Sequence, residues 1–194
     1  MKMLTRVGVV LLAAVMAVGL VAPVFAGEVE TAEIDGTIGK IIKGMDIPAM
    51  VKEHHPDVVK ILKVDGVGVL VTKGTDIEFK DEDRMKLMVG DEVEVKGEVL
   101  AVVADKIEVK DEAESEIKTD GKDVTIEGTI DKVIYPTPMM LMHHPDLVKI
   151  LVIDGVHVIV TKTTMTEGML KTGTEVEVEG KLHALIADEI EVED

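Results

Sequence analysis

A methionine, two adjacent histidines, a proline and an aspartate occur twice in this chain, in the pattern M-x-x-x-H-H-P-D. Neutral imidazole is the commonest protein ligand for metal ions, thioether sulfur favours soft ions such as Cu(I), and a nearby carboxylate can orient an imidazole. Four imidazoles from the two copies would suit zinc or Cu(II), and a mixture of imidazole and thioether would suit Cu(I). The sequence therefore predicts candidate metal ligands at Met50, His54, His55, Asp57, Met139, His143, His144 and Asp146.

The same motif has a simpler interpretation. Proline followed by aspartate is ordinary turn chemistry, and methionine fills cores that lack aromatic residues. Retention of the histidines in both copies adds little, because the neighbouring residues are copied just as faithfully. From the sequence, a site for a metal or another cationic ligand and a plain solvated loop are both open interpretations.

Two more histidines occur only in the second copy of the repeat described below. His157 and His183 stand where the first copy has Gly68 and Leu100. Each falls within an expected strand, and we interpret both as surface substitutions rather than ligands.

Catalysis has little support in the sequence. The chain has no cysteine, and its only serine, Ser115, has no histidine close to it in sequence. No phosphate-cradling glycine loop and no dinucleotide fingerprint occurs. A metal-dependent hydrolase would need a carboxylate base beside the histidines, but Glu53 has no counterpart in the second copy, where Leu141 and Met142 stand. We therefore expect a protein that is not an enzyme.

Residues 1–26 have the layout of a secretory signal peptide. Lys2 and Arg6 precede a long apolar run that ends in Val24-Phe25-Ala26. Small residues at the −3 and −1 positions predict cleavage after Ala26 and a periplasmic or secreted protein. The alternative is an uncleaved anchor helix, since residues 7–26 are long enough to span a bilayer.

The composition restricts the partners. The chain carries 38 acidic and 21 basic side chains, a formal charge of −17, so it repels phosphate backbones and anionic membranes and attracts metal ions, other cations or basic proteins. Aromatic residues, which single-stranded nucleic acids need for stacking, make up only 2% of the chain. The absence of cysteine excludes disulfides, thiolate sites and a lipoprotein anchor. We expect a metal ion or cationic ligand as partner, with a protein partner or self-association as the other option, and neither nucleic acid nor, after cleavage, membrane.

The chain contains two copies of one unit. Residues 54–75 and 143–164 are identical at sixteen of 22 positions, at an offset of 89, and further matches flank them on both sides. Two copies at so long a period indicate a tandem domain pair. We assign the first domain to residues 27–110, the second to residues 124–194, and the charged stretch 111–123 to a linker.

Each unit is expected to contain five strands. The ranges are 34–42, 58–64, 67–72, 91–100 and 104–109 in the first unit; in the second they include 126–134, 174–183 and 187–192. Asp65-Gly66 and Asp154-Gly155 are signals for type I′ hairpin turns. A short helix is expected within residues 76–88, which the second unit replaces with the shorter segment 165–171. This order is that of an OB-type barrel, so we predict an all-β fold with two tandem five-stranded OB-like barrels after an N-terminal signal peptide.

The repeated turn and core residues carry a resemblance to a family. The pattern G-T-I … V-D-G-V … V-T-x-x-T … V-E-V-x-G resembles small exported bacterial β domains of unknown function, related to the periplasmic bacterial OB-fold family. The residues that carry it are Gly36, Asp65, Gly66, Thr72, Thr75, Gly90, Gly97 and Ile107, with Gly128, Asp154, Gly155, Thr161, Thr164, Gly173, Gly180 and Ile190. Turns and core positions imply fold and hardly any function, and the His-His-Pro-Asp loop departs from this pattern.

Two hypotheses for function follow. The first is a non-catalytic exported binding protein that takes copper, zinc or another cationic ligand on the repeated M-x-x-x-H-H-P-D loops. The alternative is a structural or protein-interaction module of the periplasm or cell surface that assembles through its β domains.

Overall fold

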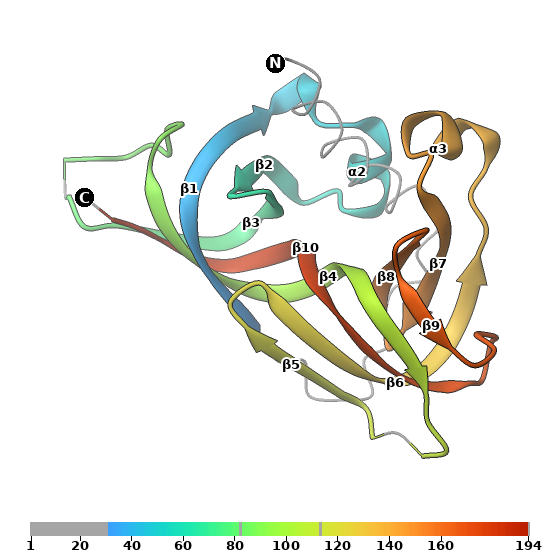
Figure 1. The fold of residues 1–194 in the computed structure, drawn as a ribbon. Coiled ribbons are helices and arrows are strands. Elements are labelled where there is room, and N and C mark those ends of the chain that lie inside the picture. The colour runs from blue at the N-terminus through green and yellow to red at the C-terminus, as the bar shows by residue number, and fades with distance from the viewer. Residues whose placement is uncertain (1–30, 82, 113, 194) are drawn as a thin grey trace.

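The computed structural model describes residues 31–81, 83–112 and 114–193 (Figure 1). The predicted signal peptide, residues 1–26, lies outside the described residues. Strands make up most of the described chain, which confirms the all-β class. No helix in this part of the chain is long and apolar enough to cross a membrane.

The elements follow the sequence repeat. The first unit contains the strands β1 (Thr31–Lys43), β2 (Val58–Val64), β3 (Val67–Phe79) and β4 (Glu92–Val109). The second unit contains β6 (Asp123–Ile134), β7 (Leu147–Ile153), β8 (Val156–Thr161), β9 (Met165–Glu167) and β10 (Glu175–Val192). Strand β5 (Glu116–Asp120) precedes β6. Two short helices, α2 (Ala49–His54) and α3 (Pro138–His143), end at the first histidine of each His-His-Pro-Asp segment. The 3-10 helix η1 (Gly44–Asp46) precedes α2.

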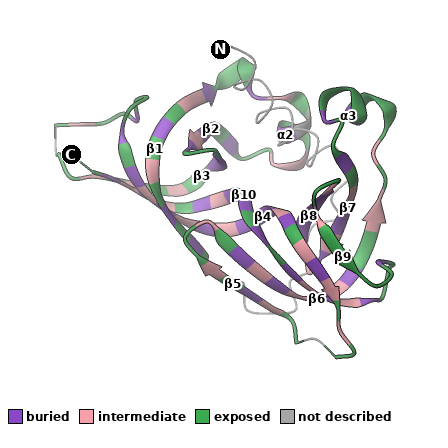
Figure 2. Cartoon of the chain, viewed as in Figure 1, coloured by how far each residue is buried: buried purple, intermediate pink, exposed green. Residues whose placement is uncertain are grey.

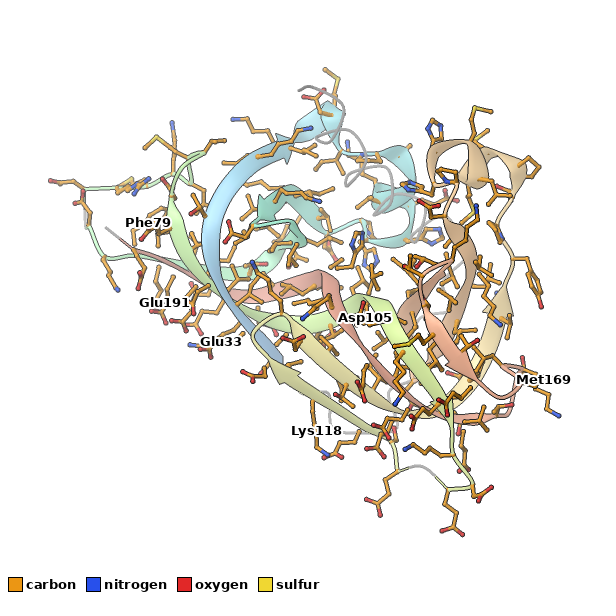
Figure 3. The ribbon with its side chains drawn as sticks, in the orientation of Figure 1. Glu33, Phe79, Asp105, Lys118, Met169 and Glu191 are labelled. Carbon is orange, nitrogen blue, oxygen red and sulfur yellow. The ribbon has the colours of Figure 1, made fainter. Side chains whose placement is uncertain are left out.

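Side chains alternate along the strands, so that each strand has one buried face and one solvent-exposed face. Along β4, the buried Val93 and Val95 alternate with Glu92 and Glu94, which are exposed or partly exposed. Figure 2 shows the same alternation of buried and exposed residues along the strands. Lysines pair with these acids: the Nζ atom of Lys96 lies 2.6 Å from Glu94. It also lies 3.9 Å from Glu33 and 3.8 Å from Glu191, which are labelled in Figure 3. Such partly exposed pairs contribute little to stability, because solvent screens the charges, so burial of the apolar faces stabilises the fold.

The predicted hairpins are confirmed. Asp65 and Asp154 have φ of 43° and 46°, and Gly66 and Gly155 also have positive φ. Two successive residues with positive φ are what a type I′ turn requires, and its twist suits the strands on either side.

Other expectations were wrong in detail. The two strands expected at 91–100 and 104–109 are one 18-residue strand, β4, which begins at Glu92. The two expected at 174–183 and 187–192 are likewise one strand, β10, which begins at Glu175. The described residues of the stretch 76–88 contain no helix, because β3 continues to Phe79. Part of the expected linker 111–123 is ordered as β5, which pairs with β6.

The two long strands pass from one unit to the other. Residues 92–98 of β4 pair with β1, and from Ala101 onward the strand pairs with β8 and β9 of the second unit. Strand β10 pairs first with β6 of its own unit and then, from Ala184 onward, with β3 of the first unit. The pairings therefore run β1–β2–β3–β10–β4 and back to β1, and β6–β7–β8–β4–β10 and back to β6. Each ring of five strands includes half a strand from the other unit.

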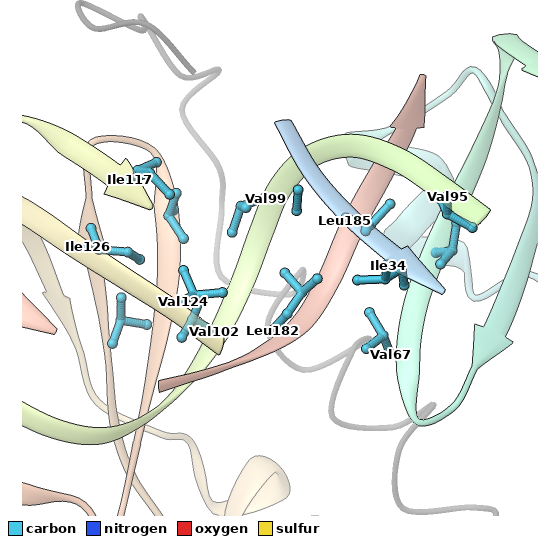
Figure 4. Packing of buried hydrophobic residues seen from close by; sticks show 14 of the residues in the cluster. Ile34, Val67, Val95, Val99, Val102, Ile117, Val124, Ile126, Leu182 and Leu185 are labelled. Atoms are coloured by element: carbon cyan, nitrogen blue, oxygen red, sulfur yellow. The ribbon is translucent and has the colours of Figure 1, made fainter. Parts of the chain in front are cut away.

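Glycine allows β4 and β10 to approach closely where they cross. A Cβ atom at Gly97 would overlap the carbonyl oxygen of Ile186, and one at Gly180 would overlap that of Val103. The apolar side chains of Val99, Val102, Leu182 and Leu185 pack around this crossing (Figure 4).

Buried side chains form two clusters. The larger cluster contains residues of both rings, among them Ile34, Ile107, Ile126 and Ile190. The smaller cluster, which we call the seam, joins α2 and α3 to the central strands. Its members are Ile42, Ile47, Val51, Val58, Ile61, Leu70, Leu100, Ala101, Met140, Leu147, Ile150, Ile159 and Ala184.

The crossing yields a stability prediction. Gly97→Ala or Gly180→Ala should lower the free energy of unfolding by about 1–3 kcal/mol, because the added methyl group meets backbone rather than a movable side chain. Gly39→Ala is the matched control, since its nearest contact would be an ordinary 3.7 Å from the Lys63 carbonyl oxygen. Urea unfolding of the three variants measures the difference. Equal midpoints for all three would contradict a close crossing.

Candidate functional site

The two His-His-Pro-Asp segments have the same local structure. His54 ends α2, and His55 caps it by donating its backbone N–H to the carbonyl oxygen of Val51 at 2.7 Å. The Val58 N–H then donates to the His55 carbonyl oxygen at 3.1 Å, which makes Pro56-Asp57 the centre of a β-turn. The same bonds recur in the second unit, from His144 to Met140 and from Leu147 to His144. The turn interpretation of Pro-Asp is therefore confirmed.

The two aspartates of the motif point to the surface. The carboxylate of Asp57 lies 3.7 Å from the Nζ atom of Lys73, and that of Asp146 lies 4.0 Å from the Nζ atom of Lys162. All four side chains are largely exposed, so these are surface ion pairs beside the turn.

The methionines divide into buried and exposed groups. Met140 is buried in the seam, as expected of core filler. Met139 and Met142 are 71% and 76% exposed on α3. Because residues i, i+3 and i+4 share one face of a helix, Met139 and Met142 lie on the same side of α3 as the exposed His143. Met50 and His54 have the same i, i+4 spacing in α2, but the side chain of Met50 lies outside what the structure describes.

The second histidine of each motif turns inward. His144 is 7% exposed, and the Nε2 atom of His55 is buried without a hydrogen-bond partner among the described residues. His55 lies one helical turn after the seam residue Val51 and one β-turn before the seam residue Val58.

His157 is buried, and His183 is half-buried with its Nε2 atom buried, so their interpretation as surface substitutions was wrong. His157 is 1% exposed, and neither of its ring nitrogens makes a hydrogen bond of normal geometry within the described chain. The same holds for the Nε2 atom of His183. Both replace inward-facing residues, since Leu100, the counterpart of His183, belongs to the seam. An inward position in an otherwise apolar strand was the sequence signal that could have revealed them.

Burial keeps these imidazoles neutral. Loss of solvent lowers the pKa of His157 to about 4, with His55 and Lys132 adding to the shift and the Leu100 backbone opposing it. Burial lowers the pKa of His183 to about 4 too, helped by the positive charges of Lys63 and His144. Burial, followed by the charge of His54, also lowers the pKa of His55. Neutral imidazole is the form that binds metal.

The predicted metal ligands do not form one cluster. Among the described residues, no group of three or more His, Asp or Glu side chains is arranged to hold an ion. Six of the eight predicted residues instead separate into the exposed turn carboxylates Asp57 and Asp146, the exposed donors Met139 and His143 on α3, and the inward-turning histidines His55 and His144.

The comparisons with known proteins identify a repeated domain. Both units match one family. It is described as Domain of unknown function (DUF5666), and the matched residues are 58–108 and 148–191. The matched segments run from β2 to β4 and from β7 to β10, which agrees with two tandem copies. No curated protein and no solved structure matches the chain significantly.

The buried histidines predict an acid-sensitive fold. Unfolded histidine titrates near pH 6.5, whereas His157 and His183 take up a proton only near pH 4, so their contribution to stability is complete above pH 6.5 and is lost as the pH falls to about 4. The free energy of unfolding should fall by on the order of 3 kcal/mol per histidine across that range. Urea unfolding from pH 7 to pH 4 measures this loss.

The control separates these two residues from the carboxylates that titrate in the same range. His183→Leu introduces the residue that the first unit has at Leu100, and it should make the pH dependence less steep. If the free energy of unfolding depended on pH as steeply in His183→Leu as in the unsubstituted protein, His183 would be protonated in the folded protein as readily as in the unfolded chain.

Proposed function

We propose that this chain is a non-catalytic exported binding protein that takes a soft transition-metal ion, Cu(I), on its His-His-Pro-Asp segments. The observation that carries the proposal is the exposed face of α3, where Met139, Met142 and His143 place two thioethers and one imidazole at positions i, i+3 and i+4. Thioether sulfur selects Cu(I) over harder ions. Zinc, the other candidate, prefers nitrogen, oxygen and thiolate ligands, and so fits this group less well.

Spacing and charge support the same function. The repeated M-x-x-x-H spacing places Met50 and His54 on one face of α2, as it places Met139 and His143 on α3. A chain with a formal charge of −17 also concentrates cations near its surface. The signal-peptide layout of residues 1–26 supports a periplasmic or secreted location.

The fold proposal follows the pairings of the strands. We propose that each ring of five strands is a barrel of OB type, within the sequence units 27–110 and 124–194, with their last strands exchanged. In such barrels the connection after the first strand often contacts ligand, and here that connection carries the histidines.

Titration with Cu(I) under anaerobic conditions, in competition with a chromogenic chelator, tests the proposed function. Met139→Leu with Met142→Leu keeps the apolar volume and removes both sulfurs, so the affinity of the exposed site should fall at least about tenfold. His143→Gln should have a similar effect.

Met169→Leu is the matched control, because Met169 is 75% exposed on another loop (Figure 3). Affinity that falls equally in the control, or in none of the variants, would contradict a site on α3.

A second candidate function, a protein-interaction module, is favoured by a difference between the units. Strand β5 pairs with Asp123–Glu127 of β6, on the side opposite β10. Among the described residues no strand pairs with the equivalent side of β1, although β5 ends near its start (Figure 1). Glu33 and Asp35 are exposed there, so this edge suits a basic extended segment.

Charge reversal tests the second candidate. A basic protein captured from the periplasm by the exported chain should be lost when Glu33→Lys and Asp35→Lys are introduced, because lysine on an edge blocks strand addition. Light scattering of the captured complex gives its stoichiometry. Capture that survives the double substitution would exclude this edge.

A further inference from the structure

Two pairs of lysines face each other across β1 and β2 of the first unit. The two strands lie side by side and antiparallel (Figure 1), and their register sets Lys40 opposite Lys63. The same register sets Lys43 opposite Lys60. Like charges directly opposite one another destabilise a sheet. The first unit therefore carries positive charge at a place where strand pairing disfavours it.

The second unit has a single lysine at the place of the first of these pairs. Lys132 of β6 lies opposite Val152 of β7. These two residues are the counterparts of Lys40 and Lys63 in the repeat. The doubled charge of the Lys40–Lys63 pair is thus a property of the first unit alone.

No carboxylate of the described residues compensates the lysines of β1 and β2. These four lysines have no ion pair and no side-chain hydrogen bond with a described residue. All three lysines of the crossing strands β4 and β10, by contrast, pair with a carboxylate. The nearest acid in sequence to Lys63 is Asp65, and its carboxylate lies 3.6 Å from the Nζ atom of Lys122. In a chain with 38 acidic and 21 basic side chains, this local excess of positive charge is unusual.

The Lys40–Lys63 pair lies beside the seam. Lys40 is two residues before the seam residue Ile42 on β1, and Lys63 is two residues after the seam residue Ile61 on β2. Residues two apart share one face of a strand. Both lysines are partly buried, and burial, followed by the charge of Lys40, lowers the pKa of Lys63. A charge that is partly withdrawn from water without a partner costs free energy, and a bound anion would offset that cost.

The next strand also differs between the units. On β3 the residue opposite Lys63 is Gly68, which has no side chain. In the second unit the corresponding neighbour of Val152 is His157. The first unit therefore combines a second positive charge with one fewer side chain at this place.

We propose that Lys40 and Lys63 form a binding site for a phosphate dianion, either as the free ion or as a phosphate monoester. Two ammonium groups match the charge of roughly −2 that such a phosphate carries at neutral pH. Lysine binds phosphate as a point charge and offers three N–H donors. The site uses none of the donors proposed for Cu(I), so it goes beyond that function and does not depend on it.

The charge of the whole chain favours a small anion over a large one. A formal charge of −17 repels extended polyanions. Exposed charges more than about 8 Å away are largely screened at physiological ionic strength. A single phosphate group at this site therefore responds mainly to the two lysines beside it.

Titration of the lysine-labelled exported chain with inorganic phosphate, followed by NMR at neutral pH and constant ionic strength, tests the inference. The side-chain resonances of Lys40 and Lys63 should shift together and saturate. Lys63→Val, which introduces the residue that the second unit has at Val152, should lower the affinity at least about tenfold, because it removes one of two charge-assisted contacts. Lys132→Val is the matched control and should leave the affinity unchanged.

A second titration, with glycerol phosphate, distinguishes the two sources of the anion. Saturation by either compound supports the site, and the tighter of the two identifies the free ion or the monoester as the ligand. The absence of a saturable shift with both compounds would overturn the inference, as would an equal response to chloride or an equal affinity in Lys63→Val. The titration of the unsubstituted chain decides the matter even if Lys63→Val fails to fold.

Discussion

The antiparallel pairing of β4 with β10 is the constraint on which the rest of the structure depends. These strands pair along nearly their whole length, and each belongs to both rings. Gly97 and Gly180 allow them to cross at backbone contact. Each ring is therefore closed by a strand segment from the other unit.

Two threonines, one from each unit, form hydrogen bonds to the crossing strands β4 and β10. The hydroxyl of Thr75 donates to the carbonyl oxygen of Ala187 at 2.7 Å, and that of Thr164 donates to the carbonyl oxygen of Ala104 at the same distance. In both cases the threonine of one unit's T-x-x-T segment holds the final strand of the other unit. The repeated T-x-x-T segment therefore stabilises the contact between the two units. The motif histidines lie near the boundary between these units.

Local patterns in the sequence were sufficient to predict the strands and their hairpins. Alternating Val and Glu in β4 and the Asp65-Gly66 turn depend only on residues close together in the chain. The partners of the last strands were not predictable in this way, because residues 184–192 find equivalent apolar edges in either unit. The role of His157 depends on that choice of partner, so it was mistaken for a surface residue, whereas the turn role of Pro56-Asp57 is local and was foreseen.

The exchange of strands also sets the order in which the chain can fold. The first ring needs residues 184–192, which are synthesised after nearly all of the second unit. The first unit therefore cannot complete its native hydrogen bonding before the second unit has been synthesised. The native pairing of both rings therefore requires β10.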